Sequence, residues 1–202
     1  MIDDTGSHNL GTDTWYEAAT EPEVVEFGTV RGLSVAGQGQ PGGTEYGTAV
    51  QALYGVAGAL LGIAGPAGQG FPMPLLEGRW WVEDEGSPFE VPREEWHWHL
   101  FLRLPDGAEA SWVDQAREMA RPQSPAVSRA QLVTFTEGRC VQVLHEGPYS
   151  EEPRSLARME ALMDAEGLVP NGLHHEVYLS DVRETDPEKL RTILRQPVRS
   201  AA

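Results

Sequence analysis

Apolar and polar residues alternate in some segments of the chain and recur at helical spacing in others. Alternation predicts a first strand that begins at residue 24. It predicts further strands at 75–83, 95–104, 133–143, 173–180 and 191–197. Helical spacing predicts helices at 44–64, 112–120 and 151–166. The positions that both periodicities point inward should form the core: Val25, Phe27, Leu33, Val35, Val141, Val143, Leu156, Met159, Val177, Leu179 and Leu194.

The order of these elements occurs twice. The pattern Val25-Glu26-Phe27, Arg31-Gly32-Leu33-Ser34-Val35, Gly39 returns 108 positions later as Val133-Thr134-Phe135, Arg139-Cys140-Val141-Gln142-Val143, Gly147. The sequence therefore predicts an α+β fold of two β-α-β-β units related by a pseudo-twofold axis. Its antiparallel sheet should carry helices on one side and a ligand cleft between the repeats.

The domain boundaries follow from the same pattern. Residues 1–22 have little apolar periodicity and are expected to form a flexible N-terminal arm, whose end Trp15 and Tyr16 could pin. One domain should occupy 23–198, with repeat 1 at about 23–105, a connecting helix at about 108–121 and repeat 2 at about 131–198.

Composition and charge narrow the class of partner. The 202 residues are 40% hydrophobic, and their formal net charge of −16 disfavours nucleic acid and acidic membrane surfaces. The apolar run 56–64 is too short to span a membrane. The acidic N-terminus does not resemble a signal peptide and there is one cysteine, so we expect a cytoplasmic protein.

Glu176 and Tyr178 share one face of the strand 173–180, while Val177 and Leu179 occupy the other. We expect the apolar pair to face the helices, so that the carboxylate and the phenol point into the cleft. Such a carboxylate could act as an acid, a base or a counter-ion to a cationic ligand. The alternative is a glutamate on a solvated face of the sheet.

Aromatic residues are the candidates for the cleft wall, because flat or cationic ligands stack on them. Aligning the repeats matches Trp81 with Tyr178, which makes Trp81 a cleft candidate and Trp80 a core candidate. Periodicity leaves open whether Trp96 and Trp98 line the cleft or fill the core. The remaining ligand-binding candidates are Tyr54, which could equally be a core tyrosine, and His174.

No motif in the sequence indicates a metal or cofactor. His97 and His99 share a strand face, but no third ligand is fixed by spacing, so we expect no metal site. Phosphate-binding and dinucleotide fingerprints are absent from the sequence, as is the Gly-x-Ser-x-Gly motif of serine hydrolases. Cys140 is interpreted as a buried small hydrophobe.

Several segments, in order, resemble the GyrI-like small-molecule-binding family over about residues 24–198. They are Pro74-Leu75-Leu76-Glu77-Gly78-Arg79-Trp80-Trp81, Trp96-His97-Trp98, Glu146-Gly147-Pro148-Tyr149-Ser150-Glu151-Glu152-Pro153, His174-His175-Glu176-Val177-Tyr178-Leu179-Ser180-Asp181 and Thr192-Ile193-Leu194-Arg195-Gln196-Pro197. The chain is similar to the stand-alone branch, which lacks a DNA-binding helix-turn-helix.

The resemblance implies a tandem β-α-β-β fold with a ligand cleft on the pseudo-twofold and Glu176 at the base of that cleft. Some stand-alone members hydrolyse the activated cyclopropane of spirocyclopropyl-cyclohexadienone natural products that alkylate DNA. In that reaction Glu176 would activate water, and Tyr178 or Tyr54 would stabilise the developing phenolate.

Three functions remain open at this stage. The chain could be a cyclopropane hydrolase that protects a cell from a genotoxic compound, or a non-catalytic binder or sensor of flat, hydrophobic, often cationic compounds. The gyrase-linked family name leaves a third function, an inhibitory protein with a larger protein partner. Both of the first two need an acidic residue in an aromatic cleft, so the sequence does not separate them.

Overall fold

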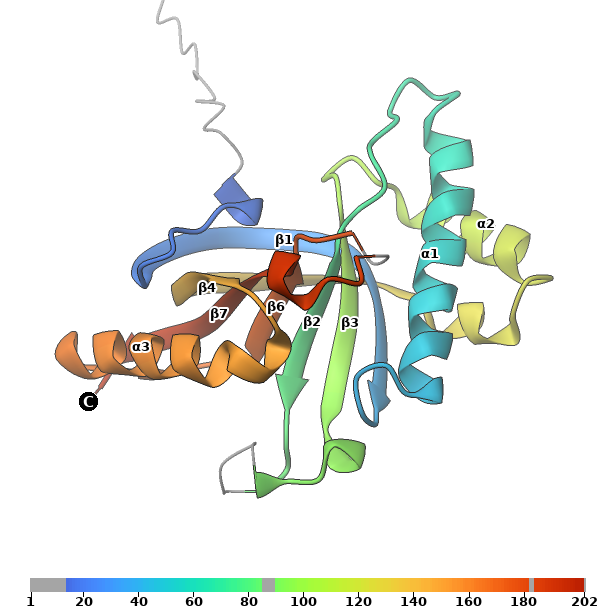
Figure 1. Cartoon of the computed structure of the whole chain (residues 1–202). Coiled ribbons are helices and arrows are strands. Elements are labelled where there is room, and N and C mark those ends of the chain that lie inside the picture. The colour runs from blue at the N-terminus through green and yellow to red at the C-terminus, as the bar shows by residue number, and fades with distance from the viewer. Residues whose placement is uncertain (1–13, 85–89, 182–183, 202) are drawn as a thin grey trace, which may run out of the picture.

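The computed structural model describes residues 14–84, 90–181 and 184–201, which form a curved antiparallel sheet with helices against its outer side (Figure 1). The strands are β1 (Glu23–Gln38), β2 (Leu76–Trp81), β3 (His97–Leu104), β4 (Gln131–Glu146), β5 (Leu168–Pro170), β6 (His174–Tyr178) and β7 (Arg191–Ser200). The helices are α1 (Thr44–Ala64), α2 (Ala110–Ala120) and α3 (Glu152–Ala165).

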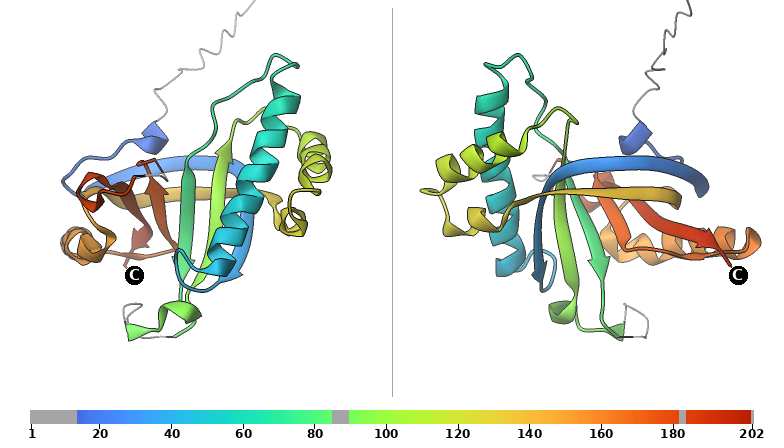
Figure 2. Two further views of the ribbon diagram at one scale, coloured as in Figure 1. Left: turned by 45° about the vertical axis from the view of Figure 1, so that its right-hand side comes forward. Right: turned by 180° about the vertical axis from the view of Figure 1, so that it is seen from behind.

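The sheet closes into a barrel. Its strand order is β4-β1-β3-β2-β6-β7-β5, and β4 also pairs with β7, which leaves β5 attached at the side of β7. The two halves are β1-α1-β2-β3 and β4-α3-β6-β7, joined by α2, and they meet where β1 pairs with β4 and β2 pairs with β6 (Figure 2). The predicted fold class is confirmed.

The first strand of each half is longer than the sequence pattern indicates. β1 continues through Gly32, a residue that looks like an interruption in the sequence. A Cβ at this position would lie 2.5 Å from ring atoms of Phe101, so glycine here makes room for a buried ring on the neighbouring strand. The short strand β5 has no counterpart among the predicted elements.

The outer face of the barrel carries the apolar cores beneath the helices. α1 packs on residues of β1, β2 and β3, among them Leu33, Leu100 and Leu102. α3 packs through Met159 and Met163 on residues of β4 and β7. These two cores are the related halves of the repeat. Of the predicted core, Val25, Phe27, Leu156 and Leu179 are only partly buried, and the others are buried.

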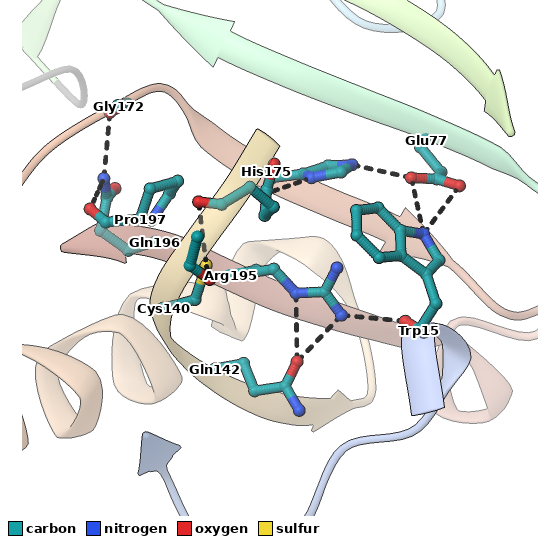
Figure 3. A network of polar contacts seen from close by, with 11 residues as sticks. Trp15, Glu77, Cys140, Gln142, Gly172, His175, Arg195, Gln196 and Pro197 are labelled. Carbon is teal, nitrogen blue, oxygen red and sulfur yellow. Dashed lines mark hydrogen bonds and ion pairs between the residues drawn. The ribbon is translucent and has the colours of Figure 1, made fainter. Parts of the chain in front are cut away.

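The inner face holds a buried polar network (Figure 3). His175 lies between two carboxylates, with Nδ1 2.8 Å from Glu137 Oε1 and Nε2 2.9 Å from Glu77 Oε2, and it has no solvent exposure. Arg195 is also fully buried and donates to Gln142 Oε1 and to the carbonyl oxygen of Trp15. The barrel interior is therefore charged as well as apolar.

The segment that precedes β1 covers this network. Trp15, in a short 3-10 helix at Thr14–Tyr16, is 2% exposed and donates from Nε1 to both carboxylate oxygens of Glu77, at 3.2 Å each. The predicted pinning of the arm by Trp15 thus corresponds to a buried side chain. Residues 1–13 of the predicted arm lie outside the described residues.

The expectation that Val177 and Leu179 face the helices is wrong. Val177 is buried, but it packs with Leu144 and Ile193 on the inner side of the barrel, and Leu179 joins them there. The prediction failed because barrel closure buries the inner face as thoroughly as the helices bury the outer one. An apolar pair on a strand therefore does not identify the helix side.

α1 is the one helix of the described residues that is long and apolar enough, by length and hydropathy, to cross a membrane. Seven of its residues are nevertheless buried, most of them in a core that the sheet and α2 share with it: Ala49, Ala52, Leu53, Val56, Ala57, Leu60 and Ala64. This burial is typical of a core helix. The apolar length of α1 exceeds the run 56–64 because glycines interrupt its apolar residues in the sequence.

Candidate functional site

A pocket of about 780 Å³ lies where the two halves of the molecule meet. Its floor comes from β2 and β6, one wall from the start of α1, and the opposite wall from the start of α3. The residues before β3 complete the rim. This volume suits a drug-sized ligand, and a position between structural repeats is a usual place for one.

Glu176 and Tyr178 stand together on the floor of this pocket. They share the outer face of β6, because side chains two residues apart in a strand point the same way. The Tyr178 hydroxyl donates to Glu176 Oε2 at 2.7 Å, which fixes the orientation of the carboxylate. Burial and the negative charge of Glu176 both raise the pKa of Tyr178, so the phenol keeps its proton at neutral pH.

Trp80, rather than Trp81, lies on the same strand face as Glu176. In the register of β2 with β6, Trp80 pairs with His174 and Gly78 pairs with Glu176, and residues paired in this way share a face. Trp80 is buried, with 6% exposure, as its predicted core role requires, and it also lines the pocket. Trp81 contacts the pocket from the end of β2, where its ring stacks on His97.

Trp96 lines the pocket, but Trp98 does not. Trp98 is fully buried, its Nε1 donates to the Gly39 carbonyl at 3.1 Å, and the Tyr46 ring covers it edge-on at 5.7 Å. Of the two roles left open for Trp98, the ligand-binding one is therefore wrong and the core one holds. Trp98 shares the strand face of Trp80, which lines the pocket, but the start of α1 covers Trp98 and excludes a ligand there.

The prediction that Tyr54 binds the ligand is also wrong, because Tyr54 is not among the residues that line the pocket. Its hydroxyl is 3.5 Å from the carbonyl oxygen of Pro74, and its ring packs against the α1 core. Tyr46, from the same helix, lines the pocket instead of Tyr54. The two tyrosines are eight residues apart, about 12 Å along the helix axis, so the start of α1 reaches the pocket and its middle does not.

Asp181, Glu184 and Glu152 are further acidic residues that line the pocket, and the sequence analysis gave none of them a role. Glu152 is the one on a helix. It begins α3, and its Oε1 atom is buried with no hydrogen-bond partner among the described residues. Burial and the nearby charge of Glu176 raise the pKa of Glu152 to about 9. The signal was available, because Glu152 falls in line with Leu156, Met159 and Met163 on the apolar face of that helix.

Two further tyrosines complete the aromatic surroundings. Tyr149 precedes α3 and its ring lies 6.2 Å from that of Tyr178, edge to face. Tyr46 stacks on Trp80 with ring centroids 6.1 Å apart. Burial raises the pKa of both hydroxyls, so both are neutral proton donors or acceptors at physiological pH. The sequence analysis gave neither tyrosine a role in the site.

The histidines of the sequence analysis lie in different places. His174 lines the pocket with Nε2 3.6 Å from Glu176 Oε1. His175 belongs to the inner network, on the opposite face of β6. His97 and His99 both pack against the ring of Trp81.

Gly78 lets the Trp80 indole and the Tyr178 hydroxyl lie close to the backbone of β2, and replacing it should displace both side chains from the pocket floor. A Cβ at Gly78 would lie 2.6 Å from Trp80 Nε1 and 3.1 Å from the Tyr178 hydroxyl oxygen. Forcing such contacts typically costs about 1–3 kcal/mol. We expect Gly78→Ala to weaken binding of a planar dye and to lower the unfolding free energy by that amount, as measured by fluorescence titration and urea denaturation. Gly28→Ala, where a Cβ meets no atom within 4 Å, is the matched control and should leave dye binding unchanged.

The chain is similar to a known domain family and to solved structures. The family model for the GyrI-like small molecule binding domain matches residues 110–199. An uncharacterized conserved protein from Listeria innocua is 39% identical, with a TM-score of 0.85 and coverage of 93% of this chain and 97% of that chain. Two structures of hydrolases from Listeria innocua are each 38% identical. Their TM-scores are 0.83 and 0.79, with coverage of 93% and 92% of this chain and 96% and 95% of theirs. No curated protein matches the chain in a sequence search.

Proposed function

Because the chain belongs to the GyrI-like family of small-molecule-binding domains, we propose that it is a hydrolase that opens the activated cyclopropane of a flat, genotoxic small molecule. The substrate class is the spirocyclopropyl-cyclohexadienones, which alkylate DNA through that ring. Hydrolysis would protect a cell from the compound. The two Listeria innocua relatives named as hydrolases support an enzymatic function of this kind.

The observation that carries the proposal is the Tyr178–Glu176 hydrogen bond on the floor of an aromatic pocket. A carboxylate held in one orientation can accept a proton from a water molecule placed beside it, which is the requirement for a general base. The rings of Trp80, Trp96 and Tyr46 offer a flat substrate surfaces on which to stack. Stacking would hold the strained methylene close to the activated water.

The reaction makes a definite demand on the site. Water attacks the ring methylene, the bond from that carbon to the spiro carbon breaks, and the electron pair moves into the dienone to give a phenolate. Negative charge thus grows on an oxygen at the far end of the substrate from the attacked carbon. The site must supply a base at one end and a hydrogen-bond donor at the other.

A binding function without catalysis is the second candidate. Four acidic residues line one aromatic pocket, a composition that favours a lipophilic cation: Glu152, Glu176, Asp181 and Glu184. In that case Glu176 would serve as a counter-ion and water would not be activated. Both candidate functions use the same pocket, but a hydrolase converts its ligand to a product whereas a binder releases it chemically unchanged.

Incubation with two probes separates these candidates. We expect a spirocyclopropyl-cyclohexadienone to gain the mass of one water, followed by mass spectrometry, at a rate far above that in buffer. A planar cationic dye tested by fluorescence anisotropy should bind and be recovered intact. Binding of both probes with no water added to the first would contradict the hydrolase and leave the binder.

A further inference from the structure

We propose that Glu152 is the general acid of this site, delivering a proton to the substrate oxygen on which negative charge develops. The proposal rests on the hydrolytic function and assigns the second half of its chemistry. The reaction needs a proton donor for that oxygen, and the Tyr178 and Tyr54 hydroxyl groups first expected to stabilise it are not available.

Neither expected hydroxyl is free to serve. Tyr178 donates its proton to Glu176 at 2.7 Å, so the same proton cannot also be given to the substrate. Tyr54 lies outside the pocket, with its hydroxyl directed at the carbonyl oxygen of Pro74. Tyr46 and Tyr149 also line the pocket, but burial raises the pKa of both phenols, so a protonated carboxyl group is a stronger acid than either of them.

Glu152 has two properties of such a donor. It lines the pocket from the first turn of α3, whereas Glu176 lies on the floor in β6, so the two carboxyl groups approach a ligand from different elements. Its Oε1 atom is buried without a hydrogen-bond partner among the described residues, an arrangement that is costly for a charged carboxylate and much less so for a neutral acid.

The surroundings of Glu152 favour its protonated form. Tyr149 and Tyr178 face it as neutral phenols, and Arg93 at the rim is the cation that acts against its protonation. His174, Asp181 and Glu184 line the same pocket. Burial and the charge of Glu176 outweigh Arg93 and raise the pKa of Glu152 to about 9. A carboxyl group with a raised pKa can serve as a general acid beside a second carboxyl group that serves as the base.

The proton balance closes with this assignment. The water proton passes to Glu176 as the new carbon–oxygen bond forms, and the Glu152 proton passes to the phenolate oxygen as the ring bond breaks. The products are a phenol and a primary alcohol. One proton transfer from Glu176 to Glu152, directly or through solvent, then restores the starting state.

The test compares Glu152→Gln with the unmodified protein across pH. With a spirocyclopropyl-cyclohexadienone as substrate, kcat/KM of the unmodified protein should fall as pH rises through about 9, because Glu152 loses its proton there. Glu152→Gln should lose two to four decades of kcat, roughly the range for general acid–base catalysis, and should lose the alkaline fall. Glu151→Gln removes an exposed carboxylate at the adjacent position and should keep both rate and profile.

A spectroscopic measurement tests the proton itself. Infrared difference spectra between pH 7 and pH 10.5 should contain a protonated carboxyl band that is absent in Glu152→Gln. Full activity of Glu152→Gln with the alkaline fall retained would overturn the assignment while leaving the hydrolase intact. An inactive unmodified protein would overturn the hydrolase, and the general acid with it. A missing carboxyl band at pH 7 would overturn the general acid alone.

Discussion

Replacing Glu176 by glutamine should reduce the rate of cyclopropane hydrolysis by roughly two to four decades while leaving the affinity for a neutral substrate almost unchanged. The amide keeps the size and polarity of the carboxylate and can still accept the Tyr178 hydrogen bond that spans 2.7 Å. It cannot accept a proton from water. The change therefore removes the base without removing the pocket, and the loss should appear in kcat rather than in KM.

The measurement is single-turnover kinetics with excess protein, which separates the chemical step from binding. Glu160→Gln changes an exposed carboxylate on α3, away from the pocket, and should behave like the unmodified protein. A cationic dye provides the contrast, because loss of a negative charge should weaken its binding in Glu176→Gln even if catalysis is absent. Retention of full hydrolysis in that variant would mean that the base lies elsewhere, and Glu152 and His174 would be examined next.

The repeat and its cleft could be predicted because both depend on periodicity. Strand alternation places Glu176 and Tyr178 on one face whatever the tertiary structure, and the pocket contains both. The side on which that face lies could not be predicted, since it depends on barrel closure between β4 and β7. Pairing between distant strands leaves no local mark in the sequence.

Sequence patterns do not determine which tryptophans line the pocket. An alignment of the repeats that is out by one residue exchanges Trp80 with Trp81, because neighbouring strand residues point to opposite faces. Trp98 shares a face with Trp80, its partner across β2 and β3, yet it is fully buried. Only the position of α1 above Trp98 separates a core residue from a pocket residue, and that position is a property of packing.

The buried polar network was also outside the reach of sequence reasoning. Glu77, Glu137 and His175 are far apart in the chain, and each looks like an ordinary polar residue of a strand. They meet because β2, β4 and β6 contribute to the inside of the same barrel. Their charges could be placed there only in combination, since a single buried charge would cost too much free energy.

Replacing His175 by alanine should lower the unfolding free energy by about 3–5 kcal/mol, the usual cost of removing one partner from a buried ion pair. Both ring nitrogens lie within 3 Å of a carboxylate oxygen, at 2.8 Å and 2.9 Å, so both donate and the ring is an imidazolium. Burial alone would lower the pKa of His175, but the hydrogen bonds to Glu137 and Glu77 outweigh it and raise the pKa. Alanine would leave Glu77 and Glu137 buried without their shared cation.

The loss should depend on pH in a defined direction. Because the folded pKa of His175 is raised, its contribution is complete below the unfolded value of 6.5 and disappears as pH rises through the folded pKa. Burial would raise the pKa of Glu137, but the hydrogen bond from His175 outweighs it and lowers the pKa. The contribution of Glu137 is therefore complete above 4.5 and is lost as pH falls through the folded pKa.

The difference in unfolding free energy between the unmodified protein and His175→Ala should therefore be greatest between pH 4.5 and pH 6.5 and should narrow on both sides. Urea denaturation at a series of pH values measures it. His174→Ala, one residue away on the pocket face, removes a side chain outside this network and should cost less than about 1 kcal/mol at every pH. A pH-independent loss in His175→Ala would mean that the ring acts through its volume alone. The inner network would then be a packing feature rather than an electrostatic support beneath the strand that carries Glu176.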